Sequence, residues 1–424
     1  MRAFLQEHRR WLITALLFFI SLISYLDRQT LSVLANTLDQ TLGVSPAQYS
    51  YVVTAFLIGS GIGYSFAGRV IDRLGARISF AVAVAVWSVV AVLHSLAVGW
   101  ISLLVLRLIL GLGESFATPT AAKVLTAWIP RRERGLCWAV FSMGNFVGAV
   151  IAPPLVVWLT LRYNWRISFV ATGALGFALL LVWLWFYDNP EKHRMVSASE
   201  RKVILEGRDL TPVAFGRVST LRLLRHPAVL GFFFTRFFTD SFTLFFVFWL
   251  PAYFQTSRAF TLAMIGLMAW IPYLGADVGF LTGGAISDWL VRRGVDSRRA
   301  RKGVMLVAAC LMPLTLVAVR VQAAPLALGL ITFIMLLQAA WNTNLTTLTI
   351  ESTPPQHVAS VIAVALLGGT LGGSISTLLT GRVIGAVGYV PVFTALGFVH
   401  LTAYLIMSAG LRAADSQKEA ITAA

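Results

Sequence analysis

Long apolar runs separated by short polar stretches dominate the pattern of hydrophobic and polar positions along this chain of 424 residues. A bilayer core is about 30 Å thick, and a helix needs roughly 20 apolar residues to cross it. The chain contains twelve runs of about this length, so the sequence predicts an all-α membrane protein with twelve transmembrane helices. The predicted spans cover residues 11–36, 49–68, 78–98, 101–124, 137–159, 167–187, 228–254, 262–290, 304–321, 326–350, 358–379 and 390–409.

One connection between these spans is much longer and more polar than the others. Residues 188–227 carry many charged side chains of both signs, and they separate six predicted spans from six. The sequence therefore predicts an N-terminal six-helix bundle in residues 1–187, a cytoplasmic linker in residues 188–227 and a C-terminal six-helix bundle in residues 228–410. Residues 411–424 are expected to form a cytoplasmic tail.

Composition supports the membrane assignment and argues against a nucleic-acid partner. Hydrophobic residues make up 58% of the chain and charged residues 12%, whereas soluble domains carry about 25% charged residues. The net charge is +16, but the basic residues lie in short runs between apolar segments and do not cluster on one soluble face. Cys137 and Cys310 both lie in apolar runs, so no metal site and no disulfide framework is expected.

The distribution of Lys and Arg over the loops predicts the orientation. With a cytoplasmic N-terminus, 25 of the 34 basic residues lie on the cytoplasmic side, five lie on the opposite side and four lie inside spans. Cytoplasmic loops of membrane proteins carry such an excess of positive charge. Both termini are therefore expected to be cytoplasmic.

A short motif follows the second span and recurs loosely after the eighth. Residues 68–77 have the sequence GRVIDRLGAR, and residues 284–294 again place an acid four residues after a glycine, with arginines and a glycine behind it. A glycine at position 68 permits close helix approach, and Asp72 can accept hydrogen bonds from a neighbouring helix N-terminus. Arg73 and Arg77 can extend to lipid headgroups. The predicted gating residues are Gly68, Asp72, Arg73, Gly75, Arg77 and Asp288.

Ionisable residues inside the spans are the candidates for function. A charge there costs about 2.5–3.5 kcal/mol on insertion scales, so each needs a reason. Arg107 and Glu114 share a helix face about 10 Å apart along the axis, too far to pair directly, and each is expected to find partners on other helices. The ionisable residues well inside the spans are Asp27, Arg28, Arg107, Glu114, Arg236, Asp240 and Asp277.

Two of these arginines are candidates for binding a carboxylate. Tyr25 and Arg28 share a helix face, and a guanidinium can bind a carboxylate with two hydrogen bonds. An ion pair of Arg28 with Asp27 or Glu114 is the alternative. Arg236 could supply a second cationic contact, or it could simply be neutralised by Asp240 one helical turn later.

Polar residues in the tenth span suggest further contacts to a ligand. Asn342 and Asn344 suit a polyhydroxylated molecule, and Trp341 or Trp249 could form a stacking surface. Packing between helices explains any one of these residues equally well.

Several stretches resemble a known family. The motif at residues 68–77, in a chain with twelve spans and a central linker, resembles the loop signature of the major facilitator superfamily. Residues 25–28 (YLDR), together with Arg107, Glu114 and Pro119, are similar to its anion:cation symporters. Residues 152–158 (APPLVVW) and 269–272 (AWIP) resemble the bacterial hexuronate-transporter branch.

The resemblance implies a fold of two six-helix bundles around a midplane site. It assigns the substrate carboxylate to Arg28, helped by Tyr25, and proton coupling to Glu114, with Asp27 and Arg107 as further candidates. It also places Ser60 where many relatives have a tyrosine that lines the site, with Tyr64 one turn later. The arginine at position 236 favours a uronate-like or more anionic ligand.

These observations together predict a secondary active transporter of the cell inner membrane. It is expected to carry a small organic anion, such as a hexuronate or an aldonate, into the cell by proton symport and alternating access. We expect it to act as a monomer among membrane lipids, without cofactor, metal or nucleic acid.

Two alternatives keep the same fold. The first is a drug/proton antiporter, which would use acidic anchors and not the cationic ones found here. The second is a carrier of a non-sugar carboxylate, such as an aromatic acid or a dicarboxylate. An enzyme is not expected, because the sequence contains no nucleophile–base pair and no metal cluster.

Overall fold

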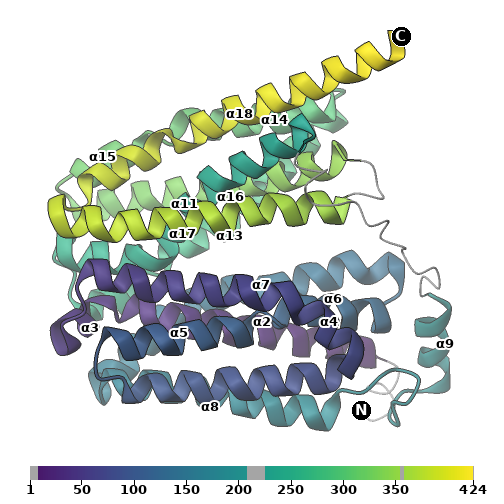
Figure 1. Ribbon diagram of the computed structural model, residues 1–424, viewed down its shortest axis with the longest axis horizontal. Helices are drawn as coiled ribbons and strands as arrows, with labels where there is room; N and C mark the ends of the chain where they lie inside the picture. Colours follow the sequence, from purple (N-terminus) through teal and green to yellow (C-terminus); the bar gives the residue numbers. More distant parts are fainter. Residues whose placement is uncertain (1–7, 208–224, 354–357, 424) are drawn as a thin grey trace. The chain divides into compact units, whose positions relative to one another are not determined.

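The computed structural model describes residues 8–207, 225–353 and 358–423, and every regular element in these ranges is a helix (Figure 1). Arg2, the linker segment 208–224 and residue 424 of the predicted tail lie outside the described residues. Within the described ranges, eleven helical segments are long and apolar enough to cross a membrane. One of them, Pro46–Leu96, has 51 residues, about 75 Å of helix and enough for two crossings. The segments therefore agree with the twelve predicted spans.

The chain divides into two compact units. Unit 1 contains α2 (Arg9–Val33), α3 (Ala35–Leu42), α4 (Pro46–Leu93) from Tyr51 onward, α5 (Trp100–Glu114), α6 (Ala117–Trp128), α7 (Arg131–Arg162), α8 (Trp165–Phe186), α9 (Ala198–Glu206) and α12 (Leu262–Met268). Unit 2 contains α11 (Pro227–Arg258), α13 (Ile271–Arg292), α14 (Ser297–Leu311), α15 (Leu314–Arg320), α16 (Ala324–Glu351), α17 (Val358–Val387), α18 (Val390–Ala423) and residues 45–50 at the start of α4.

A single glycine turns the second predicted span into the third. α4 continues through both spans, but Gly75 has φ 80° and ψ 157°, outside the helical region. A residue with a Cβ rarely adopts a positive φ, whereas glycine does so at little cost. Gly75, one of the predicted gating residues, is therefore the hinge of a helical hairpin.

Three other predicted spans each consist of two helices. α5 ends at Glu114 and α6 begins at Ala117, just before Pro119. α13 begins at Ile271, one residue before Pro272, and α15 follows Pro313. Proline has no N–H to donate to the fourth residue before it, so an apolar run that contains one can break there. Hydropathy alone predicted one continuous span in each case.

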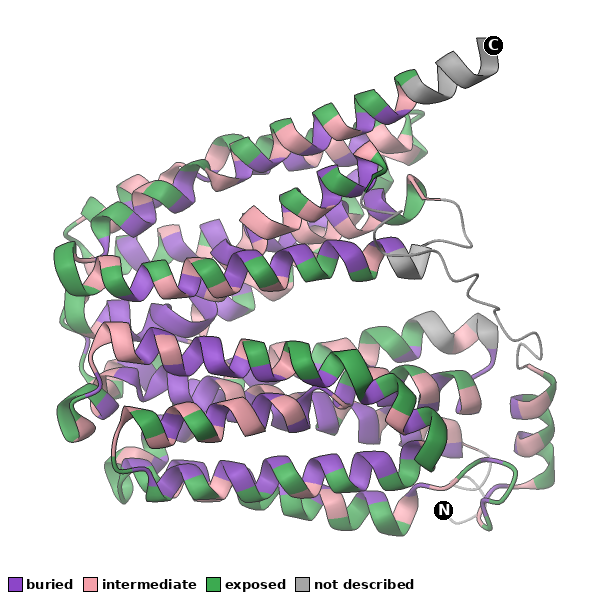
Figure 2. Cartoon of the chain, viewed as in Figure 1, coloured by how far each residue is buried: buried purple, intermediate pink, exposed green. Residues whose placement is uncertain are grey.

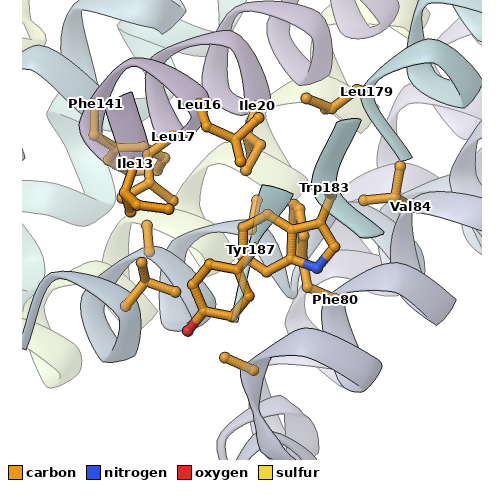
Figure 3. Close-up of a cluster of buried hydrophobic side chains, with 14 of the residues drawn as sticks. Ile13, Leu16, Leu17, Ile20, Phe80, Val84, Phe141, Leu179, Trp183 and Tyr187 are labelled. Carbon is orange, nitrogen blue, oxygen red and sulfur yellow. The ribbon is translucent and has the colours of Figure 1, made fainter. Parts of the chain in front are cut away.

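Aromatic packing forms the core of unit 1 (Figure 3). The Trp183 ring stacks on Tyr187 with centroids 4.0 Å apart and contacts Phe80 edge-on at 4.7 Å. The Trp183 indole N–H donates to the carbonyl of Arg77 at 3.0 Å, so α8 is fixed to the second half of α4. Leu17 and Ile20 of α2 belong to the same cluster and are fully buried. This packing holds the helix that carries Arg28.

Exposed residues recur along the helices of the chain (Figure 2), and many of them are large and apolar. Leu181, Leu281 and Leu405 are each about 70% exposed or more, and Trp185 is 76% exposed. A soluble protein rarely exposes large apolar patches. Lipid is therefore the solvent that these helices require, and the chain is a multi-pass membrane protein.

The linker contributes a short helix that caps α2. The first turn of α2 has no acidic residue, and the side chain of its N-cap residue does not accept a capping hydrogen bond. The Glu200 carboxylate of α9 instead accepts hydrogen bonds from the backbone N–H groups of Arg9 at 3.0 Å and Arg10 at 3.1 Å. A carboxylate stabilises a helix N-terminus through these bonds and through the helix dipole.

We expect Glu200→Ala to lower the free energy of unfolding by about 1–2 kcal/mol, because one buried and one part-buried N–H group at the start of α2 lose their acceptor. Denaturant titration of the purified protein in detergent measures this change. Glu206→Ala is the matched control, since Glu206 lies in the same helix and, among the described residues, forms an ion pair only with Lys202, in which both side chains are exposed. A loss no larger than that of the control would contradict the capping role.

Candidate functional site

A buried ion pair joins α2 to the end of α5. The Arg28 Nη2 atom lies 2.9 Å from Oε2 of Glu114, and the Ser24 hydroxyl donates to the same oxygen at 3.0 Å. The Glu114 side chain is 1% exposed, whereas that of Arg28 is 28% exposed. The carboxylate is thus out of reach of solvent, while more than a quarter of the Arg28 side chain remains exposed.

Aromatic rings surround the Arg28 guanidinium. Its carbon lies 4.9 Å from the centroid of Phe56 and 5.4 Å from that of Tyr25. A cation over an aromatic face is stabilised, more strongly where water is scarce. Tyr25 and Arg28 share one face of α2, as their spacing predicted.

Arg107 and Asp27 form a second, deeper pair of charged residues. Arg107 is 1% exposed and Asp27 is 2% exposed. The Arg107 guanidinium donates a long hydrogen bond of 3.5 Å to the backbone carbonyl of Asp27. Within the described residues, neither carboxylate oxygen of Asp27 has a well-formed hydrogen bond. Arg107 and Glu114 both contact α2, Arg107 at Asp27 and Glu114 at Arg28.

Ser60 and Tyr64 lie on α4. The Ser60 hydroxyl donates to the carbonyl of Phe56 in its own helix at 2.9 Å. Tyr64 is 52% exposed and close enough to Arg28 to interact with it electrostatically. The structure therefore gathers Tyr25, Tyr64, Arg28 and Glu114 in unit 1. Their roles in binding and proton coupling remain predictions.

In unit 2, Arg236 is held by two neighbours. Its guanidinium lies 3.4 Å from Asp240 on α11 and donates to the Thr346 hydroxyl on α16 at 2.7 Å. Both members of the ion pair are less than one fifth exposed. The pairing left open by the sequence is therefore present, and Thr346 adds a contact across two helices.

The aromatic and amide candidates of unit 2 lie mainly in packed positions. Asn344 donates to the carbonyls of Gly283 and Ala340, both at 2.9 Å. Trp341 is fully buried edge-on to His400, and Trp249 is 2% exposed against Tyr49.

Asn342 differs from its neighbours on α16. It is half-buried and lines a small cavity of about 50 Å³ together with Gln338 and Phe280. Of the four candidates Trp249, Trp341, Asn342 and Asn344, it is the one whose position leaves room for a ligand atom.

The gating motif forms ion pairs in each unit. Asp72 accepts from Lys123 of α6 at 2.6 Å, and Asp288 pairs with Arg301 of α14 at 2.9 Å. The sequence pointed to a helix N-terminus as the partner of Asp72, whereas the structure supplies a lysine side chain. The repeat in sequence is thus also a repeat of acid–base pairing.

Other residues of the motif also differ from expectation. No described atom lies within 4 Å of a Cβ placed on Gly68, so no helix approaches closely there. The exposed Arg77 donates to the carbonyl of Leu184 at 2.7 Å and pairs with Asp188 at 3.4 Å. Arg73 is exposed.

Two residues that the sequence did not single out belong to this site. Ser24 binds Glu114, and Phe56 packs against Arg28. Ser24 lies four residues before Arg28 and so on the same helix face, a signal that could have identified it. Phe56 lies in an apolar run without a distinguishing signal. Within the described part of the chain, no group of three or more potential metal ligands is present.

The profile of the Major Facilitator Superfamily matches residues 17–377. The chain belongs to this superfamily. It is therefore a transporter and not an enzyme. A solved structure of the xylose transporter XylE from E. coli has the same fold, with a TM-score of 0.74 at 15% identity over 94% of this chain and 95% of that one.

Two relatives with established names are sugar-acid transporters. The chain is 30% identical to the hexuronate transporter of Escherichia coli (strain K12) over 415 residues, which covers 94% of this chain and 93% of the relative. It is 32% identical to the galacturonate transporter of Dickeya chrysanthemi over 277 residues, 65% of this chain and 80% of that one. The facilitator is thus closely related to sugar-acid transporters.

Proposed function

We propose that this facilitator is a proton-coupled symporter that carries a small sugar-acid anion, such as a hexuronate or an aldonate, into the cell across the inner membrane. The observation that carries the proposal is the ion pair of Arg28 with Glu114, in which the arginine side chain is partly exposed and the carboxylate is buried. The names of the relatives support a sugar acid as the substrate. Both termini would be cytoplasmic, as the distribution of basic residues predicts.

The geometry of the pair suggests how substrate and proton are coupled. Arg28 can bind a substrate carboxylate more fully, through two parallel hydrogen bonds, once its Nη2 no longer donates to the Glu114 carboxylate. Two carboxylates that share one guanidinium repel each other when both are ionised. A proton on Glu114 removes that repulsion and releases Arg28 for the substrate.

Coupling of this kind is reciprocal. If protonation of Glu114 strengthens substrate binding, bound substrate strengthens protonation by the same factor. With the site open outward, proton and anion load together. Because the charges are then neutralised, closing a dry site around them costs less free energy. The bundles of residues 1–187 and 228–410 then move, so that the site closes to the outside and opens to the inside. Both ligands leave on the inner side.

Further side chains would complete the site. Tyr25 and Tyr64 can donate hydrogen bonds to substrate oxygens, with Ser60 on the same helix as Tyr64. Arg236, held by Asp240 and Thr346, can contribute a second positive contact. Trp249, Trp341, Asn342 and Asn344 would shape the C-terminal side, and Asp27 with Arg107 would act as a second proton-responsive pair.

The gating residues would stabilise one state of the transport cycle. The pairs Asp72–Lys123 and Asp288–Arg301 each join two helices within a unit. Gly75 would allow the hairpin of α4 to form, while Arg73 and Arg77 would anchor it near the membrane surface. Transport would be the work of a monomer surrounded by lipid.

Uptake into proteoliposomes tests the proposal. Purified protein is reconstituted with an alkaline interior, and accumulation of labelled uronates, aldonates, aldarates and aromatic acids is measured with and without a protonophore. We expect a sugar acid to accumulate and the protonophore to abolish its accumulation. Accumulation of substrate that is the same with and without the proton gradient would contradict symport. Transport of cationic drugs in place of acids would favour the antiporter alternative.

A further inference from the structure

An apolar groove of about 370 Å³ runs between α17 and α18 on unit 2 and is closed at its base by α11. Both helices pack along α11, so the space between them is floored by Phe237 and Phe238. A Cβ at Gly372 would meet the carbonyl of Phe237, so α17 and α11 touch closely at the inner end. Beyond that point the groove continues along α17 to Val383 and reaches Pro391 at the start of α18.

The walls of the groove favour a hydrocarbon occupant. Ile375 and Leu379 on its rim are 48% and 55% exposed, in a helix that lies in the membrane. The Ser241 hydroxyl on its floor donates to the Phe237 carbonyl at 2.8 Å and is thereby satisfied. Lining residues 372 to 383 of α17 span about 16 Å, roughly half of a bilayer core. The groove therefore has the length of one leaflet.

A positive charge stands at the outer end of the groove. Arg382 is exposed, and among the described residues it forms no ion pair. It lies three residues after Leu379 and so continues the same face of α17. The first turn of α18 borders this end through Pro391 and Val392, and the N-terminus of a helix also attracts negative charge.

We propose that this groove binds one anionic phospholipid, with an acyl chain between α17 and α18 and the phosphate at Arg382. Charge complementarity identifies the headgroup as anionic, and the apolar walls at membrane depth identify the chain. The predicted topology places the site in the leaflet opposite the cytoplasm. This lipid site is separate from the proposed transport site and does not depend on the identity of the transported acid.

Lipid binding by purified protein tests the proposal. Detergent-solubilised protein is titrated with phosphatidylglycerol or with zwitterionic phosphatidylcholine, and bound lipid is counted by native mass spectrometry. We expect one phosphatidylglycerol per chain to be retained in preference to phosphatidylcholine. Equal retention of the two lipids would overturn the proposal.

Two variants separate the headgroup from the acyl chain. Arg382→Gln should weaken phosphatidylglycerol binding about five-fold, the effect expected for one cation near a membrane surface. Ala395→Phe places a ring on the exposed rim and should remove the bound lipid. The matched controls are Arg320→Gln and Ala363→Phe, at exposed positions outside the groove. Unchanged binding in Arg382→Gln or Ala395→Phe, or equal losses in the controls, would contradict the assignment.

Discussion

Replacing Glu114 with Gln is expected to abolish proton-driven accumulation while exchange of labelled for unlabelled substrate across the membrane continues. The amide cannot ionise, so it mimics the protonated carboxyl that leaves Arg28 free for the substrate. With one proton per substrate and a gradient of one pH unit, the native protein should accumulate substrate about ten-fold. The variant should reach only equal concentrations on both sides.

Counterflow and accumulation in the same proteoliposomes measure the two activities separately. Glu206→Gln, at an exposed position in α9, is the matched control and should behave as the native protein. Asp27→Asn tests the other buried acid of the site. Full accumulation by Glu114→Gln would show that the proton is carried elsewhere.

Replacing Arg28 with Ala should weaken substrate binding by at least about 100-fold. The substitution removes two charge-assisted hydrogen bonds, each worth about 1.5–3 kcal/mol. Arg28→Lys retains the charge but not the planar fork, so binding should be weaker than native and stronger than in Arg28→Ala. Titration of the purified protein with a sugar acid, followed by calorimetry, gives the three affinities.

A double variant separates binding from stability. Arg28→Ala leaves the buried Glu114 carboxylate unpaired and should destabilise the protein, whereas Arg28→Ala combined with Glu114→Gln removes both charges. We expect the double variant to recover stability and not binding. Arg69→Ala, at an exposed position on α4, is the control. Affinity within three-fold of native in Arg28→Ala would contradict the proposed role.

Hydropathy was sufficient to predict the membrane-spanning helices because the lipid bilayer imposes the same requirement on each of them. A helix that crosses the bilayer needs about 20 apolar residues regardless of its neighbours. The same reasoning could not locate the breaks at Ser115 and Phe116 or at Met312, because a proline within an apolar run sometimes breaks a helix and sometimes does not. Pro153 and Pro154 lie inside α7 without interrupting it.

A search for long apolar runs cannot predict short polar helices. α9 has nine residues and no long apolar run, so nothing in its hydropathy predicts a helix. Its position depends on Glu200, whose partners at Arg9 and Arg10 are about 190 residues away in sequence. Contacts of this kind follow from tertiary structure.

The sequence predicted which residues form the candidate site better than it predicted which residue each of them contacts. The cost of a charge in a membrane drew attention to Arg28 and Glu114, but the partner of Arg28 could have been Asp27 or Glu114. The structure decides for Glu114, which is 86 residues away. Conversely, the amide of Asn344 suggested a ligand, while the structure directs it at two backbone carbonyls. A polar residue in a span does not reveal whether a helix or a solute satisfies it.

Proton uptake on substrate binding tests the central claim most directly. The enthalpy of binding a sugar acid is measured in two buffers with different ionisation enthalpies, and the difference gives the number of protons taken up per substrate. If Arg28 leaves Glu114 to bind the substrate, Glu114 takes up a proton. The native protein should then take up about one proton per substrate bound, and Glu114→Gln should take up none. Binding without proton uptake in the native protein, or equal uptake in the variant, would contradict it.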